Sequence, residues 1–412
     1  MCIEKVCKLA KDNVNAVAFL SNDERNEMLD IIAQSLVDKT SEILKANEQD
    51  ILASSTAPKH FIDRLRLDDN RIKGIANGLL ELKGIDCPVG EVLDAFTTKD
   101  GLNIEKVRVP LGVIGIVYEA RPNVTADVIG LCLKSGNAVV LRGSKDAINS
   151  NIKIVEVIKT ALKNKGYNSE FIQIITDTNR DSVLKFVKMN EYIDVIFPRG
   201  GAGLIKATVE NATVPVIETG AGVCHTFVEK TADQDMAIEI IKNAKLQRPS
   251  VCNAMESLMV SREIANEFIP KLLDELESFE VKCYGDSDTC AFDKRIILAS
   301  DDTYYREYLA YEFSIKVVDS VEEGIKRINT YGTKHSDAII TKDNEKAEKF
   351  LNEVDSSCVY VNASTRFTDG FMFGFGAEIG ISIQKLHARG PMGLKELTSY
   401  KYKIVGQGQT RK

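Results

Sequence analysis

Cys252 has the residue type and the setting that best suit covalent chemistry. It lies in the run QRPSVCNAME at 247–256, after apolar residues at helical spacing and before the apolar segment 257–260. Pro249 and Ser250 end the helix, so we expect Cys252 on a short connection between a helix and a buried strand. A thiol held there can act as a nucleophile once backbone amides, an Arg or a helix end lower its pKa from about 8.5 toward neutrality. Position alone does not decide between this role and that of a small buried hydrophobic residue, which is the commoner role of a cysteine.

Three predicted strands end in glycine and polar residues, a composition that suits phosphate binding. The three runs are RGSK at 142–145, PRGGAG at 198–203 and ETGAG at 218–222. The second run opens directly into a predicted helix, so the amides of Gly200 and Gly201 could face a phosphate. No complete G-x-G-x-x-G stands at a strand-to-helix turn, which makes the signal for a standard dinucleotide site weak. The glycines fit tight turns equally well.

The predicted elements divide the chain into a helical start and two series of alternating strands and helices. Residues 3–84 have the apolar spacing of helices, and 92–109 has the alternation of a hairpin. From Leu111 short apolar strands alternate with helices up to a strand at 214–217, and a second alternation runs over 264–361. A glycine-rich loop and a final strand at 397–405 follow. Strands without polar alternation indicate parallel sheets covered on both faces, which bind ligands at the carboxyl ends of their strands.

Composition excludes several classes of protein. The 412 residues are 44% hydrophobic, enough for two or three domains with their own cores. The net charge of -7 excludes a broad surface for nucleic acid or anionic lipid. No apolar run approaches the roughly 20 residues of a membrane span, and the first residues lack the pattern of a signal peptide. Nine scattered cysteines without a C-x-x-C pair and four dispersed histidines argue against a disulfide framework and a metal site. We therefore expect a cytoplasmic protein.

Four motifs, in order along essentially the whole chain, resemble one known family. They are PLGVIGIVYEARPNVT at 110–125, the cysteine run, INTYGTKHSDAI at 328–339 and LHARGPMGL at 386–394. Together they resemble the γ-glutamyl phosphate reductases (glutamate-5-semialdehyde dehydrogenases) of the aldehyde dehydrogenase superfamily. One departure is Arg327, where the family pattern has histidine.

The resemblance implies an α/β fold with two parallel-sheet domains and a small β flap. The NADP-binding domain would comprise 1–91 and 111–247, and the catalytic domain 248–384. The segments 92–110 and 385–412 would form the flap through which copies of the chain associate. A homo-oligomer, dimeric or tetrameric, is the implied assembly.

The resemblance also implies an activity, the reduction of L-glutamyl 5-phosphate by NADPH to L-glutamate 5-semialdehyde and phosphate in proline biosynthesis. Glutamate 5-kinase would pass on the substrate. Cys252 would attack the acyl phosphate, and the thioester would accept hydride. No metal is required.

The site residues carried over from the family fall into three groups. The catalytic residues would be Cys252, the oxyanion donor Asn123, and Glu218, either a catalytic helper or a residue that holds Cys252 or the nicotinamide. The cofactor would contact Arg142, Ser144, Lys145, Gly200, Gly201 and Glu312, and the substrate Arg121, Ser364, Thr365 and Arg366. Without the family, Asn123 reads as a turn residue, and Glu312 and Arg366 as exposed residues. Cys132 and Cys224, in apolar contexts, should tolerate Ala with losses of stability alone.

Two other functions fit the sequence. One is an aldehyde dehydrogenase that oxidises its substrate or acylates CoA. The other is a dinucleotide-binding regulatory module in which Cys252 is inert and buried. Phosphate dependence, CoA dependence and the reactivity of Cys252 separate the three.

Overall fold

The computed structural model describes residues 2–411, with the backbone alone at Lys59 and His60. The chain forms two compact units. Unit 1 comprises Met1–Thr219, Gly374–Gly380 and Met392–Lys412, and unit 2 comprises Gly220–Phe373 and Ile381–Pro391. The first boundary therefore lies at Gly220, where we expected it near Arg248. The reason is that the strand after Gly220 pairs in the sheet of unit 2.

Unit 1 is built on a four-stranded parallel sheet of order β5-β4-β3-β6. β3 and β4 are buried along their whole length, as their continuous apolar sequences predict. The strands are β3 (Val113–Tyr118), β4 (Ala138–Gly143), β5 (Ile172–Ile174) and β6 (Val195–Arg199), and the helices between and after them are α7 (Asn123–Lys134), α8 (Ile148–Asn164), α9 (Arg180–Phe186) and α10 (Ala202–Asn211). The strand predicted at 214–217 is wrong, since only Val216 bridges to Ile196 and Pro215 has no amide hydrogen to donate.

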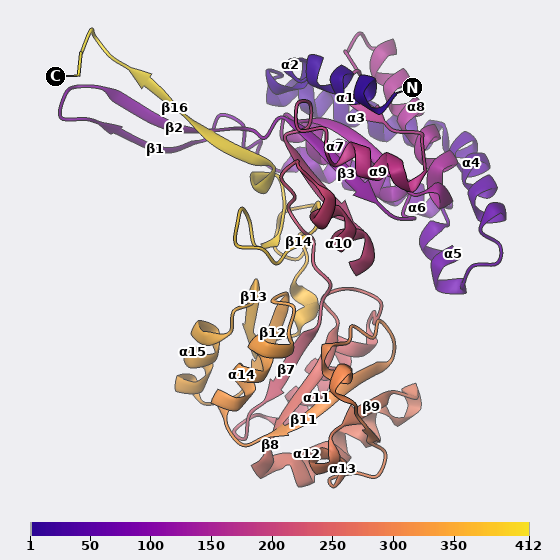
Figure 1. The fold of residues 1–412 in the computed structure, drawn as a ribbon, viewed down its shortest axis with the longest axis vertical. Helices are drawn as coiled ribbons and strands as arrows, with labels where there is room; N and C mark the ends of the chain where they lie inside the picture. Colours follow the sequence, from indigo (N-terminus) through magenta and orange to yellow (C-terminus); the bar gives the residue numbers. More distant parts are fainter. Residues whose placement is uncertain (1, 412) are drawn as a thin grey trace. The chain divides into compact units, whose positions relative to one another are not determined.

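The helices at the start of the chain lie in unit 1 beside the sheet and the helices that cover it (Figure 1). Their boundaries follow local signals. Ser21 caps α3 and exchanges hydrogen bonds with Glu24 in a capping box, and the side chain of Asp68 caps α6. The helices are α1 (Ile3–Asp12), α2 (Asn15–Ala18), α3 (Asn22–Asp38), α4 (Thr40–Ala53), α5 (Lys59–Leu65) and α6 (Asp69–Glu81).

A three-stranded antiparallel ribbon extends from unit 1 (Figure 1). The predicted hairpin forms β1 (Val92–Thr97) and β2 (Asn103–Pro110), and β16 (Thr398–Val405) pairs with β2 along its full length. The side chains of β1 are exposed throughout, and those of β16 from its second residue on. The ribbon is thus held by backbone hydrogen bonds, and its side chains contribute little to a core.

Unit 2 contains a seven-stranded parallel sheet of order β10-β9-β11-β8-β7-β12-β13. The strands are β7 (Cys224–Val228), β8 (Met255–Ser261), β9 (Lys282–Gly285), β10 (Ile297–Leu298), β11 (Glu312–Val318), β12 (Ser336–Ile340) and β13 (Cys358–Val361). The helices are α11 (Gln234–Leu246), α12 (Arg262–Leu276), α13 (Ser287–Cys290), α14 (Val321–Tyr331) and α15 (Asn344–Glu353). A small antiparallel pair, β14 (Ile381–Ser382) and β15 (Gly390–Pro391), completes the unit.

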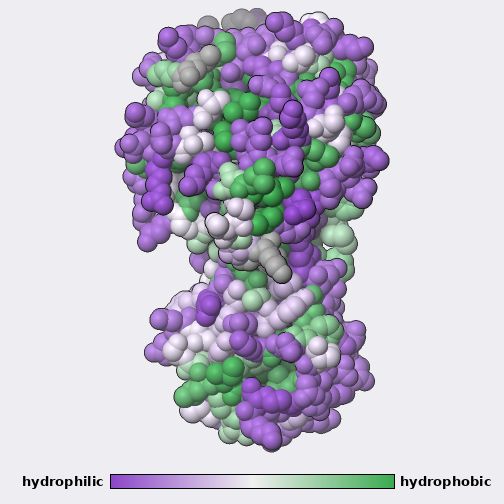
Figure 2. Space-filling view, turned by 90° about the vertical axis from the view of Figure 1, so that its right-hand side faces the viewer, coloured by the Kyte–Doolittle hydropathy of each residue, from purple (hydrophilic) through white to green (hydrophobic). Residues whose placement is uncertain are grey.

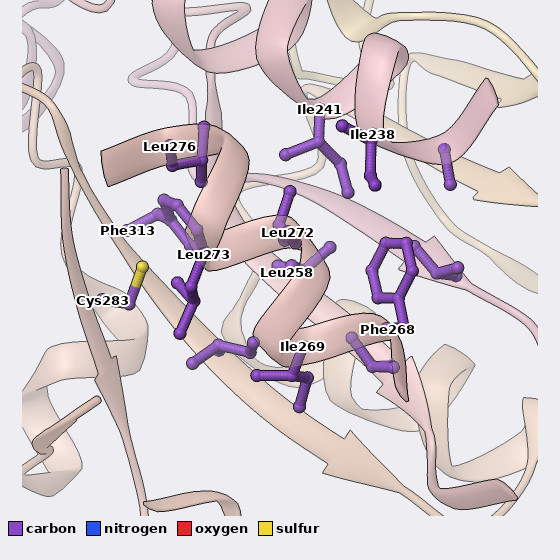
Figure 3. Packing of buried hydrophobic residues seen from close by; sticks show 14 of the residues in the cluster. Ile238, Ile241, Leu258, Phe268, Ile269, Leu272, Leu273, Leu276, Cys283 and Phe313 are labelled. Atoms are coloured by element: carbon purple, nitrogen blue, oxygen red, sulfur yellow. The ribbon is translucent and has the colours of Figure 1, made fainter. Parts of the chain in front are cut away.

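The core of unit 2 lies between its central strands and two helices. Figure 3 shows Phe268, Ile269 and Leu272 of α12 near Leu258 of β8, with Ile241 of α11 beside them. All five side chains are fully buried, each contributing about 1.5–3 kcal/mol by its removal from water. This packing holds α11 and β8, the two elements that flank Cys252.

Hydrophilic side chains cover most of the face in Figure 2, and hydrophobic ones form separate patches. Within residues 2–411, the length and hydropathy of every helix fall short of what a bilayer-crossing segment requires.

Candidate active site

Cys252 lies on the turn between α11 and β8, as predicted, and its side chain is half-buried. The amide of Ala254 donates to the carbonyl of Val251 at 3.1 Å, which closes the turn around the cysteine. The thiol thus projects from an irregular segment between two packed elements. This geometry suits a side chain that must be both held and reached.

Gly222, just before β7, and Cys224, its first residue, both contact the carbonyl group of Cys252. A Cβ atom on Gly222 would lie 1.4 Å from the Cys252 carbonyl oxygen, so only glycine fits there. The thiol of Cys224 donates to the same oxygen, with Sγ and O 3.2 Å apart. Burial raises the pKa of Cys224 well above its ordinary value, so it remains a donor. We expected Cys224 to serve packing alone, whereas it also contacts the candidate nucleophile.

Three predicted substrate residues, Ser364, Thr365 and Arg366, brace the cysteine turn from the glycine-rich loop. The Thr365 hydroxyl donates to the Asn253 carbonyl at 2.7 Å. Arg366 donates from Nε to Gln247 Oε1 at 3.1 Å and from Nη1 to Asn253 Oδ1, and its amide donates to the Ser364 hydroxyl.

Arg366 also supplies positive charge close to the turn. Burial lowers its pKa, and the neighbouring Arg248 lowers it further, while Cys252 acts in the opposite direction. A half-buried guanidinium in this position favours a thiolate over a thiol.

Glu312 lies at the start of β11 in the same unit and is half-buried. Its Oε2 accepts from the Tyr284 hydroxyl at 3.1 Å. The other predicted residues, Asn123, Arg121, Glu218, Arg142, Ser144, Lys145, Gly200 and Gly201, belong to unit 1.

Asn123 is the first residue of α7, directly after Pro122, and not part of a free turn. Its Nδ2 donates to Asp127 Oδ2, one helical turn further on, at 3.0 Å. Burial raises the pKa of Asp127 to about 6, partly offset by the hydrogen bond from Asn123 and by Arg199. The bond orients the amide of Asn123 and leaves its second hydrogen for another acceptor. Arg121, two residues earlier, is exposed.

The end of β4 and the residues after it carry two cations, of which Arg142 is buried and Lys145 is exposed. Arg142 is buried and donates to the carbonyls of Gly143 and Asn179 and to the Ser182 hydroxyl. Lys145 is exposed. Between them, the hydroxyl of Ser144 is buried without a hydrogen-bond partner among the described residues. This arrangement leaves the Lys145 amine accessible to a ligand, whereas Arg142 donates to groups within unit 1.

Gly200 and Gly201 lie between β6 and α10, as predicted, but a side chain already contacts them. Glu119 Oε2 accepts from the Gly201 amide at 3.0 Å. A Cβ atom on Gly200 would lie 2.6 Å from the Glu119 carboxyl carbon. The glycines therefore admit a carboxylate at the start of α10, where we expected a phosphate. Glu218, half-buried, is the penultimate residue of the first segment of unit 1.

Sequence reasoning missed several residues that shape the site. They are Gly222, Cys224, Asn253 and Asp127, together with a buried ion pair between Lys245 and Glu256. The signal for the ion pair was a charged residue at an apolar position on each side of the cysteine turn.

Comparison with known proteins identifies the family. The model of the aldehyde dehydrogenase family matches residues 1–291, more than half of the chain. The chain belongs to the aldehyde dehydrogenase family. Its parallel-sheet α/β units are those of that family's fold, which confirms the predicted fold class.

Relatives within the family are similar over the whole length. A γ-glutamyl phosphate reductase of Lachnospira eligens is 53% identical, with 99% of each chain covered. One of Ligilactobacillus salivarius is 49% identical and covers 100% of this chain and 99% of its own. The crystal structure of a γ-glutamyl phosphate reductase from Thermotoga maritima has a TM-score of 0.97 at 44% identity, with both chains fully covered. These similarities confirm the predicted resemblance to γ-glutamyl phosphate reductases.

Proposed function

We propose that this family member reduces L-glutamyl 5-phosphate with NADPH to L-glutamate 5-semialdehyde and phosphate, the second step of proline biosynthesis from glutamate. The observation that carries the proposal is the braced Cys252 turn in a chain about half identical, end to end, to γ-glutamyl phosphate reductases.

Cys252 would act as the nucleophile. Its thiolate attacks the acyl carbon, the bond from that carbon to the phosphate oxygen breaks, and phosphate leaves with the electron pair. Phosphate is a good leaving group, so the step needs no strong general acid. After reduction, the carbon–sulfur bond breaks and the thiolate is regenerated with the aldehyde.

Negative charge on the former carbonyl oxygen needs fixed donors. The Cys252 amide and the second Nδ2 hydrogen of Asn123 are the proposed donors, and removing one such donor typically costs about 3–4 kcal/mol. Asp127 supports this role because its carboxylate holds the Asn123 amide in one orientation. Arg121 and Arg366 are proposed to attract the anionic substrate, and Ser364 and Thr365 to fix the turn. Glu218 is proposed to act either as a catalytic helper or as a residue that holds Cys252 or the nicotinamide.

The residues of unit 1 fit a cofactor with a 2'-phosphate. The exposed Lys145 and the buried, unpartnered hydroxyl of Ser144 offer a cation and a donor after β4, where parallel sheets bind ligands. Glu312 is a further proposed contact, and so are Gly200 and Gly201 at the start of α10, provided that the cofactor displaces the Glu119 carboxylate from the Gly201 amide. NADPH, when bound, supplies the hydride for the thioester. Arg142 would support this strand end rather than contact the phosphate.

The β ribbon is proposed to pair with another copy of the chain, which makes the protein a homo-oligomer. Tyr402 and Ile404 of β16 are each more than half exposed, and edge strands with apolar side chains invite pairing. A cytoplasmic location and substrate transfer from glutamate 5-kinase complete the proposal.

The test is the reverse reaction, NADP reduction by purified protein with glutamate semialdehyde. We expect activity only when inorganic phosphate is added. Activity without phosphate would indicate an oxidising aldehyde dehydrogenase, and activity that requires CoA an acylating one. No activity, together with a Cys252 that iodoacetamide fails to modify at neutral pH, would favour the regulatory module.

A further inference from the structure

A buried ion pair joins the two ends of the cysteine connection. Lys245 is the penultimate residue of α11 and Glu256 the second residue of β8, so Cys252 lies on the chain between them. Lys245 Nζ and Glu256 Oε2 are 2.7 Å apart, and both side chains are 0% exposed. The pair therefore closes the loop that carries the nucleophile.

Stability is a weak reason for such a pair. Removing two charges from water costs more than their attraction commonly returns, and apolar residues of similar volume often give an equally stable protein. Burial raises the pKa of Glu256 to about 7 and lowers that of Lys245, so burial opposes both charges. A role in geometry accounts for the pair better than a role in stability.

The second oxygen of Glu256 extends the contact to another segment. Oε1 accepts from the amide of Leu309 at 3.3 Å. Leu309 has a φ of 55°, a left-handed conformation that is unfavourable for a leucine and persists where surrounding contacts impose it. Glu256 thus holds a strained turn next to the cysteine connection.

That turn leads back to Cys252. Two residues before Leu309, Glu307 Oε1 accepts from the Gly222 amide at 2.8 Å. Gly222 in turn packs against the Cys252 carbonyl, where a Cβ atom would overlap it. A continuous series of contacts therefore runs from the ion pair through Leu309, Glu307 and Gly222 to the nucleophile's own peptide.

We propose that Lys245 and Glu256 are positioning residues for Cys252, which fix both ends of its connection and, through Leu309 and Glu307, hold Gly222 against its peptide. The inference rests on the proposed role of Cys252 as the nucleophile. Neither charged group needs to touch substrate or cofactor.

The experiment compares two double variants with wild type. Lys245→Met/Glu256→Leu removes the charges and the acceptor of the Leu309 amide, whereas Lys245→Met/Glu256→Gln removes the charges and keeps an oxygen for it. A matched control is Lys346→Met/Glu229→Gln, because Glu229 is also buried and paired with a lysine in unit 2 but belongs to another part of the sheet. The readouts are thermal unfolding, kcat and KM, and the pH-dependent rate at which iodoacetamide alkylates Cys252, with Cys252→Ala as the background for the other cysteines.

We expect Lys245→Met/Glu256→Leu to unfold within about 4 °C of wild type while kcat falls at least roughly 30-fold and KM for NADPH changes less than about 3-fold. Its alkylation profile should shift in rate or in pH. The glutamine variant should be intermediate, and the control should change stability without altering alkylation.

A folded Lys245→Met/Glu256→Leu protein with kcat and alkylation within about 2-fold of wild type would overturn the inference. If that variant does not fold, the glutamine variant decides by the same readouts. Turnover by folded Cys252→Ala would instead reject the proposed function, so the two failures remain distinguishable.

Discussion

The Cys252 turn and the β ribbon are opposite kinds of structure. The turn has no regular secondary structure, yet Cys224, Thr365 and Arg366 bond to its backbone and side chains. The ribbon is regular, with β16 and β2 in register over eight residue pairs, yet most of its side chains face outward. The turn is held by contacts within its own unit, whereas the ribbon presents exposed side chains that the proposed second copy of the chain would cover. Regular backbone pairing therefore does not indicate that the side chains of a segment are buried.

The first prediction concerns the Cys252 turn. Cys252→Ala should reduce turnover by at least about 10⁴-fold, because no thioester can form, with little change in unfolding temperature. Steady-state kinetics and thermal unfolding measure the two effects. The control is Cys283→Ala, which opens a small cavity in the core of unit 2 and should lower stability while leaving kcat intact. Substantial turnover by folded Cys252→Ala would show that Cys252 is not the nucleophile.

The second prediction tests the outward-facing ribbon. Tyr402→Asp with Ile404→Asp should convert the oligomer to monomers, since charges replace two apolar side chains on one face of β16. Light scattering after size-exclusion chromatography gives the mass. Lys401→Asp with Lys403→Asp, on the alternate face of the same strand, is the matched control. An unchanged mass in the Tyr402/Ile404 variant would mean that the ribbon needs no partner.

The third prediction distinguishes a brace from an anion clamp at Arg366. Because the guanidinium bonds both Gln247 and Asn253, Arg366→Lys should lose nearly as much kcat/KM as Arg366→Ala, roughly 10–100-fold, with the KM for cofactor unchanged. If bracing is the whole role, Asn253→Ala combined with Arg366→Ala should lose little more than either alone. Fully additive losses would assign Arg366 to the substrate instead, and wild-type kinetics in both Arg366 variants would remove it from the site.

The fourth prediction compares the buried cation in β4, Arg142, with the exposed cation that follows it, Lys145. Lys145→Ala should raise the KM for NADPH by roughly 10-fold and that for NADH far less, because the exposed amine can meet a 2'-phosphate. Arg142→Ala should lower stability and affect both cofactors alike, since its donors are used within unit 1. A selective NADPH effect from Arg142 alone would reverse the assignment.

The smallest effect is a pH dependence of stability from Asp127. Its folded pKa is raised to about 6 from 3.8, so between those values the folded state binds more protons than the unfolded state. Stability should therefore fall as pH rises from about 4 to 6, by roughly 1–2 kcal/mol for this partly exposed group. Asp127→Asn should remove that slope in denaturant unfolding. A slope that survives in the variant would assign it to other groups.

Sequence patterns predicted the parts of the fold that depend on local burial. Continuous apolar strands indicated parallel sheets, and Pro249 indicated the turn that carries Cys252. Such patterns could not predict pairing between distant strands. Periodicity reports which residues are buried, but not which segment packs against them. The pairing of β16 with β2 joins residues nearly three hundred positions apart, and the transfer of β7 to unit 2 has the same cause.

Contacts within the candidate site were predictable only in part. Residue type suggested Cys252 and the family resemblance suggested Arg366, but neither predicted that Arg366 would bond to both Gln247 and Asn253. Glu119 at the start of α10 and the bonds of Arg142 depend on side-chain directions that arise from tertiary packing. Buried charges at Lys245 and Glu256 were visible as exceptions to an apolar pattern, although their pairing was not.

The chain passes between the two units four times, after Thr219, Phe373, Gly380 and Pro391. A ribosome makes the main segment of unit 2 before the last strand of unit 1 exists. Until β16 has been synthesised, β2 has β1 on one edge and an open edge on the other, a condition in which a nascent chain is prone to pair wrongly. A premature stop codon anywhere before Thr398 would make that open edge permanent. Synthesis of β16 therefore decides whether the product is a finished protein or a substrate for chaperones and proteases.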